Sequence, residues 1–168
     1  LDTYNQTDIA NDAGINSDEP FTPHAGPLDP RIDFTIGRRG IEYNGYGPFT
    51  GKENIRASFS DISGPYAAKK SMYYAGDDTN KGTGGWGQQR SGINYHIIRY
   101  ADVLLMAAEA AVETGSLETA RGYVNQVRQR AIDGPRADSS PNYSISTYGS
   151  AWTDQAVARK AVRFERRL

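Results

Sequence analysis

The chain lacks cysteine, has only two histidines and carries almost no net charge. Without cysteine it can form no disulfide, no thiolate metal site and no cysteine nucleophile. His24 and His96 have no partner at metal-site or catalytic-triad spacing, so we expect surface or packing roles for both. Nineteen basic side chains against twenty acidic ones give a net charge of −1, which argues against a nucleic-acid-binding domain.

Long apolar runs are also missing. Asp102 and Glu109 interrupt the most apolar stretch, so it falls short of the roughly 18 apolar residues that a membrane span needs. No signal sequence follows Leu1, and the last helical pattern reaches Leu168 without a glycine, proline or polar stop. We therefore expect the chain to be part of a longer polypeptide.

Glycine and proline are concentrated in residues 1–92, which indicates long loops with little helical periodicity. Short strands are expected at about Asp33–Ile36 and Lys70–Tyr74. We expect residues 1–92 to be a loop-rich, ligand-facing segment and residues 93–168 to be helical. Both are expected to be parts of one domain truncated at both ends.

Two helices joined by a tight turn are predicted in the second segment. The first, about Ile97–Thr114, is apolar on nearly every face, which predicts burial almost all round. Gly115 ends it, and Ser116 can cap an amphipathic helix over about Leu117–Ala131, which Gly134 and Pro135 end. The residues expected to face water in this second helix are Arg121, Gln126, Arg128 and Gln129.

A helix pair of roughly 34 residues with small residues at set positions is typical of the tetratricopeptide repeat. The matching residues are Leu104, Ala107, Ala108 and Ala111 in the first helix and Ala120 and Val124 in the second. One repeat cannot bury its own faces. The fold class is therefore predicted as mainly α, a tetratricopeptide-like scaffold with long irregular loops and a few short strands.

Charges in the first helix are predicted to pair internally rather than to contact a ligand. Arg99, Asp102 and Glu109 lie on or near one helical face, with Glu165 and Arg166 as natural partners from a last helix. Thr153 can cap that last helix. Its expected apolar stripe is Val157, Ala161, Phe164 and Leu168.

Four motifs in order resemble the SusD/RagB family of outer-membrane nutrient-binding lipoproteins. They are IRYADVLLM at residues 98–106 followed by AEA at 108–110, DPRI at 29–32 with Thr35 and Ile36, VNQVRQRA at 124–131, and FERRL at 164–168. The resemblance spans about residues 29–168. It implies a C-terminal portion of the SusD-like α fold.

The resemblance further implies a cell-surface protein of a Bacteroidetes-type bacterium, held in the outer membrane by a lipid anchor outside this fragment. Such a protein captures oligosaccharides, or in some cases peptides, and passes them to a SusC-like TonB-dependent transporter. It would work without catalysis and without a cofactor. A helical-repeat scaffold for protein partners is the alternative.

A glycan site needs exposed aromatic rings beside polar side chains, because sugar C–H faces stack on rings while hydroxyls form hydrogen bonds. Trp86, in a polar glycine-rich loop, either stacks on ligand or plugs the loop. Tyr43, Tyr46 and Phe49 lie in a second glycine-rich loop, where packing is the favoured role of each, and at most one of Tyr73 and Tyr74 would meet ligand. The full set of candidates is Trp86, Tyr46, Tyr43, Phe49, Tyr73, Asp78 and Asn80.

Catalytic and metal-binding patterns are incomplete. The glycines at 82, 84 and 87 match a dinucleotide fingerprint, but no apolar strand precedes them. Asp77 and Asp78 are adjacent in a loop, which does not specify a glycosidase pair. The same loop lacks the ligand series and the closing glutamate of a calcium loop. The sequence therefore offers no acid/base pair at a recognisable spacing, and no enzyme is expected.

Overall fold

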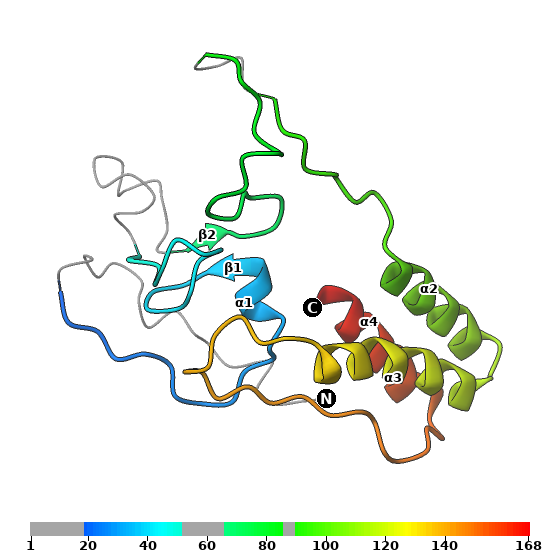
Figure 1. Cartoon of the computed structure of the whole chain (residues 1–168). Helices are drawn as coiled ribbons and strands as arrows, with labels where there is room; N and C mark the ends of the chain where they lie inside the picture. The colour runs from blue at the N-terminus through cyan, green and yellow to red at the C-terminus, as the bar shows by residue number, and fades with distance from the viewer. Residues whose placement is uncertain (1–18, 52–65, 86–89) are drawn as a thin grey trace. The chain divides into compact units, whose positions relative to one another are not determined.

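A computed structural model of the chain describes residues 19–51, 66–85 and 90–168 (Figure 1). The described residues form two compact units. The helical unit contains His96–Pro135 and Ser144–Leu168, and the loop unit contains residues 19–51, 66–85, 90–95 and Arg136–Tyr143. Within the described residues there are four helices and one two-stranded sheet, so the prediction of a mainly α fold is confirmed.

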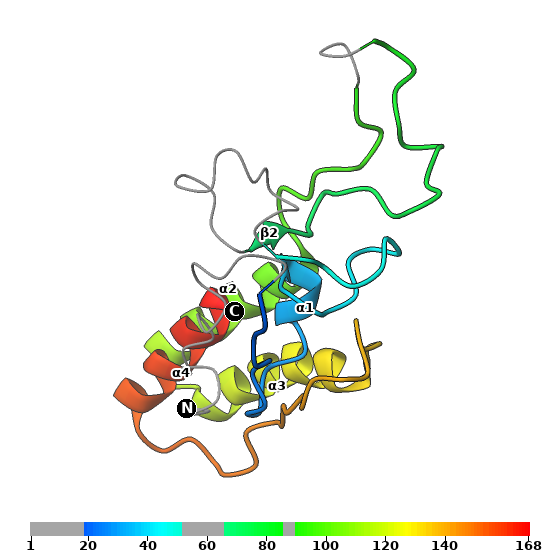
Figure 2. The ribbon, with the colours of Figure 1, turned by 90° about the vertical axis from the view of Figure 1, so that its left-hand side faces the viewer.

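Three helices make up the helical unit: α2 (Tyr100–Glu113), α3 (Leu117–Asp133) and α4 (Gln155–Arg167). α2 and α3 form a hairpin, and α4 packs against both (Figures 1 and 2). Apolar side chains from all three helices meet in one core, so each helix buries one face. The core residues are Leu105, Ala108, Val112, Ala120, Val124, Ala158 and Val162.

The helix boundaries follow local chemistry. Gly115 has a φ of +80°, the left-handed conformation that a glycine adopts without steric cost, and Ser116 is the N-cap residue of α3. Gly134 ends α3, as predicted. The N-cap of α4 is Asp154 rather than Thr153, because the Asp154 carboxylate accepts a hydrogen bond from the Val157 backbone N–H at 2.9 Å.

The prediction that α2 is buried almost all round is wrong. Its buried residues are Leu104, Leu105, Ala108 and Val112, which form a single stripe. Val103 and Met106 are exposed, and so are Ile97 and Ile98, which precede the helix. The physical reason is that α3 and α4 cover α2 only on the side of that stripe.

Two charged residues replace part of the predicted apolar interior. Arg128 does not face water as predicted: its side chain is 1% exposed and donates to the fully buried carboxylate of Glu165 at 2.9 Å. Because Glu165 points inward, the buried face of α4 is rotated from the predicted stripe. It consists of Ala158, Ala161, Val162 and Glu165, whereas Val157 is exposed.

The loop unit contains a short helix, α1 (Ile32–Thr35), followed by β1 (Ile36–Gly37). β1 pairs antiparallel with β2 (Ala67–Ala68), with Ile36 opposite Ala68. The strand predicted over Asp33–Ile36 is therefore mostly a helical turn, which the Asp29 carboxylate stabilises by accepting a hydrogen bond from the Arg31 backbone N–H at 2.9 Å.

No strand forms over Lys70–Tyr74. Lys70 and Ser71 lie in a turn, where Ser71 has a φ of +60°. This left-handed conformation breaks the extended backbone that a strand requires. The short pairing of Ala67 and Ala68 with β1 takes the place of the predicted strand.

Polar groups hold the interior of the loop unit. The buried Asp33 carboxylate accepts hydrogen bonds from Arg38 Nε at 2.6 Å and Nη2 at 2.8 Å, and from the Tyr143 hydroxyl at 2.5 Å. Burial, followed by the bond to Asp33, raises the pKa of Tyr143 far above its ordinary value. Buried Lys69 donates from Nζ to the Glu42 carbonyl oxygen at 2.6 Å, and its burial lowers its pKa.

Candidate functional site

A tight hairpin over Glu42–Pro48 forms the first of two neighbouring loops in the loop unit. Its ends form an antiparallel bridge, and the Glu42 carboxylate accepts hydrogen bonds from Gly45 N at 2.7 Å and Gly47 N at 3.3 Å. Gly45 and Gly47 have φ values of +84° and +89°. The turn therefore needs glycine at both positions, and it places Tyr46 at its tip.

The second loop, residues 73–81, lies against this hairpin. Ala75 N donates to Asn44 O at 2.8 Å, and the Tyr46 hydroxyl lies 3.5 Å from Tyr74 O. Tyr46 is 59% exposed and Tyr74 is 58% exposed. Two solvent-accessible tyrosines therefore lie on neighbouring loops, with the Tyr46 hydroxyl beside the Tyr74 backbone.

Polar side chains follow Tyr74 in the second loop. The Asp77 carboxylate accepts hydrogen bonds from Asn80 Nδ2 at 2.8 Å and Thr79 Oγ1 at 2.9 Å, and these bonds lower the pKa of Asp77. The Asn80 amide N–H groups are thus used to shape the loop. Asp78 is 87% exposed and accepts from Lys81 Nζ at 3.1 Å, which raises the pKa of Lys81.

A short stem continues from this loop. Gly82 N donates to Arg90 O and Gly92 N donates to Asn80 O, both at 2.8 Å, and Lys81 bridges Ser91 in antiparallel pairing. A Cβ atom on Gly82 would approach Arg90 N and O to 2.6 Å, so close backbone approach explains this glycine without a dinucleotide. Trp86, between the two sides of the stem in sequence, lies outside the described residues, as does Gly87.

The remaining predicted aromatics are less accessible. Phe49 is 3% exposed and packs against Tyr43 with ring centroids 5.1 Å apart, which favours the packing role for Phe49. The Tyr43 hydroxyl donates to Ala68 O at 2.7 Å, so this ring also holds the loop unit together. Tyr73 is half-buried, with Lys81 Nζ 6.0 Å from its ring centroid.

Sequence reasoning set Tyr73 ahead of Tyr74, whereas Tyr74 is the more exposed of the two. Adjacent side chains of a strand point to opposite faces, but this alternation does not tell whether Tyr73 or Tyr74 faces outward. The contact with the Glu42–Pro48 hairpin decides this, and that contact links residues about 30 positions apart.

Charges of the helical motif pair with one another, as predicted. Arg99 Nη2 lies 3.0 Å from Asp102 Oδ1 at the start of α2. Glu109 accepts hydrogen bonds from Arg163 at 3.1 Å and Arg166 at 2.7 Å, which link α2 to α4 and lower the pKa of Glu109. Glu165, also considered as a partner for these charges, pairs with Arg128 instead.

Residues 19–51, 66–85 and 90–168 contain no cluster of three or more histidine, aspartate or glutamate side chains that could hold a metal ion. His24 is half-buried and His96 lies at the edge of a groove beside α2. None of the described helices is both long and apolar enough to cross a membrane.

Packed helices together with loops that expose aromatic rings make this a helical-scaffold protein, an arrangement suited to non-covalent binding. The chain belongs to the SusD family, whose sequence model matches residues 2–168. The family has a helical-repeat fold, so the predicted fold and the recognised family are both confirmed. A search among curated proteins gives no match.

Members of the SusD family bind glycans or other nutrients at the cell surface and are not enzymes. They are typically outer-membrane lipoproteins that work with SusC-like transporters. The family match covers nearly the whole chain, which is more than the residues 29–168 indicated by the motifs.

Proposed function

We propose that this protein captures oligosaccharides at the outer face of the outer membrane without altering them and delivers them to a SusC-like TonB-dependent transporter. The helical unit serves as scaffold and the loop unit as binding surface, both within one SusD-like domain. A lipid anchor of the kind typical of the family holds the protein at the membrane.

The observation that carries the proposal is the pair of exposed rings, Tyr46 and Tyr74, on neighbouring loops. An exposed ring offers a flat apolar surface on which the C–H face of a sugar can stack. The free lone pairs of the Asp78 carboxylate can accept hydrogen bonds from sugar hydroxyls. In this proposal Tyr73 lies at the edge of the surface, and Tyr43, Phe49 and Asn80 support it. Trp86 remains a candidate from the sequence.

Isothermal titration calorimetry tests this assignment with maltoheptaose, xylohexaose, mannohexaose and a peptide mixture as probes. We expect heat from at least one sugar. Tyr46→Ala and Tyr74→Ala should each weaken that binding about tenfold, since a stacking contact contributes about 0.5–1.5 kcal/mol beyond area burial. Tyr100→Ala is the matched control, because Tyr100 is an exposed tyrosine of α2, and its affinity should be unchanged.

Three other outcomes would each contradict part of this assignment. Heat from peptides alone would replace the sugar ligand with a peptide. Loss of binding in Tyr100→Ala but not in the loop variants would move the site to the helical unit. Sugar products found in the same samples by chromatography would contradict the absence of catalysis.

A protein-binding scaffold is the second candidate, and the exposed apolar side chains Ile98, Val103 and Met106 favour it. Apolar side chains grouped on a surface are typical of protein contacts. If this is the function, all sugar titrations give no heat. In that case Met106→Glu weakens capture of a purified SusC-like transporter, whereas Tyr46→Ala does not.

A further inference from the structure

The helix α4 carries five basic residues and a single acidic one, Glu165. Glu165 is buried and paired with Arg128, so its charge is used inside the helical unit. The solvent face of α4 is therefore basic. This surface lies outside the loop unit, and the pairs of Arg163 and Arg166 with Glu109 account for only part of its charge.

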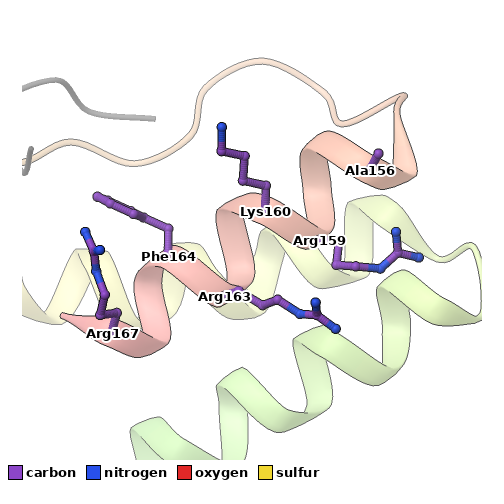
Figure 3. Close-up of a pocket in the computed structure, with 6 residues that line it drawn as sticks. All are labelled: Ala156, Arg159, Lys160, Arg163, Phe164 and Arg167. Carbon is purple, nitrogen blue, oxygen red and sulfur yellow. The ribbon is translucent and has the colours of Figure 1, made fainter.

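Three of the five basic residues of α4 pair with acidic residues of α2, and Arg166, which pairs with Glu109 at 2.7 Å, is one of them. Arg159 and Arg163 project toward α2 (Figure 3), where Arg159 pairs with Glu113 at 2.6 Å and Arg163 with Glu109 at 3.1 Å. Lys160, Phe164 and Arg167 project to the other side of the helix (Figure 3). Among the described residues, no acidic side chain pairs with Lys160 or Arg167.

These three side chains line a shallow groove of about 390 Å³, together with Ala156, Arg159 and Arg163. The Arg167 guanidinium carbon lies 5.0 Å from the Phe164 ring centroid, and Lys160 stands one turn before the ring. Seven residues of helix span about 10 Å, roughly the length of two sugar rings. The groove thus combines one apolar platform with a cation at each end.

Such a face is poorly suited to helix packing. Covering Lys160 and Arg167 with an apolar helix would leave two charges buried without partners, which is strongly unfavourable. The groove is lined by six residues, fewer than the roughly 20–30 that each side of a protein–protein interface contributes. Its volume lies in the range of small-molecule sites, about 300–1,000 Å³.

We propose that the groove formed by Lys160, Phe164 and Arg167 binds an acidic oligosaccharide. The Phe164 ring contacts a sugar face, while Lys160 and Arg167 pair with carboxylate or sulfate groups on either side. This adds a second binding surface to the proposed function and rests on it only for the class of ligand. Neutral sugars would use the tyrosine pair, whereas charged ones would use α4.

The test is calorimetric titration of the whole protein with tetragalacturonate, in which every sugar carries a carboxylate, and with uncharged maltotetraose. Tetragalacturonate is expected to bind, and Lys160→Ala with Arg167→Ala should weaken it at least tenfold. Phe164→Leu should weaken it several-fold. The charge-matched control is Lys70→Ala with Arg130→Ala, both exposed residues that are not part of α4, and its affinity should stay within twofold of the parent protein.

Raising the salt concentration should weaken tetragalacturonate binding to the parent protein more than to the α4 double variant. Equal affinities of parent and double variant, or equal binding of maltotetraose in this groove, would overturn the inference. Tighter binding of a glutamate decapeptide than of tetragalacturonate would also overturn it, in favour of an acidic polypeptide. The tyrosine variants report on the proposed function separately, because Tyr46→Ala should leave tetragalacturonate binding unchanged.

Discussion

The interior of the helical unit is built from apolar side chains of α2, α3 and α4, whereas that of the loop unit is built largely from hydrogen-bonded polar groups. In the helical unit the one buried ion pair, among the described residues, joins Arg128 of α3 to Glu165 of α4. In the loop unit Asp33 and Arg38 form a buried pair that half-buried Tyr143 joins, and the buried apolar residues include Leu28, Pro30, Ile41 and Phe49.

This difference shows how the two units can divide their roles. Helices bury apolar faces against one another, so their sequence is constrained by packing along the whole length. The loop unit is held by specific hydrogen bonds from its backbone and from a few buried polar residues. Tyr46 and Tyr74 of the loop unit are each more than half exposed and can be presented to ligand.

The largest expected effect comes from breaking the ion pair of the helical unit. Arg128→Ala leaves the Glu165 carboxylate buried without its guanidinium partner, and should lower the free energy of unfolding by about 3–5 kcal/mol. Urea unfolding followed by helical circular dichroism measures this. Arg128→Met with Glu165→Leu should recover most of the loss, whereas a loss below about 1 kcal/mol in Arg128→Ala would show that the pair is hydrated.

A smaller and more local effect is expected in the loop unit. Asp33→Ala removes the acceptor of both Arg38 and Tyr143, and should cost about 2–3 kcal/mol, since Arg38 retains some access to water. Hydrogen exchange should show lost protection in the loop unit and little change in α3. Asp78→Ala, at an exposed position, is the control. Equal loss of protection in both units would contradict their separate cohesion.

The salt bridges between α2 and α4 lie at the surface, so they should contribute less to the free energy of unfolding than the buried pair of Arg128 and Glu165. Glu109→Gln is expected to lower stability by less than about 1 kcal/mol near neutral pH. The pKa of Glu109 is depressed in the folded protein by hydrogen bonds from Arg163 and Arg166. Its contribution is therefore complete above the unfolded pKa and is lost as pH falls through the lowered folded pKa.

Urea midpoints of parent and Glu109→Gln, measured from about pH 7 to about pH 2.5, check this sign. The two proteins should differ at the higher pH and converge at the lower one. A difference that widens on acidification would mean that Glu109 is not held in its charged form by the arginines.

The smallest effect on stability is expected at the proposed binding surface. Tyr46→Ala removes an exposed ring and should change the free energy of unfolding by less than about 0.5 kcal/mol. Thermal unfolding without ligand measures it. A cost above about 2 kcal/mol would make Tyr46 part of the packing of the loop unit, on a par with Phe49.

Sequence reasoning succeeded where structure depends on neighbours along the chain. Gly115, Ser116 and Gly134 set the helix ends, and the three-residue step from Arg99 to Asp102 predicted their pairing. It failed where the partner is distant. Arg128 was placed in water because its helix is amphipathic, but Glu165, 37 positions later, draws it into the interior.

The same dependence on partners distant in sequence decided which residues of the candidate site could be predicted. Glycine-rich loops with aromatics could be recognised from composition, and Tyr46 could be named. The preference for Tyr74 over Tyr73 depends on contacts between loops. The basic face of α4 could be read only in part, because the sequence does not show which of its arginines pair with Glu109 and Glu113.

Backbone amide chemical-shift mapping by NMR, with the neutral oligosaccharide that binds best, tests most directly whether the loop unit binds while the helical unit supports it. The largest shifts are expected for residues 42–48 and 73–81, with α2 and α3 unchanged. Shifts centred on α2 and α3, with both loops unmoved, would contradict this division of roles.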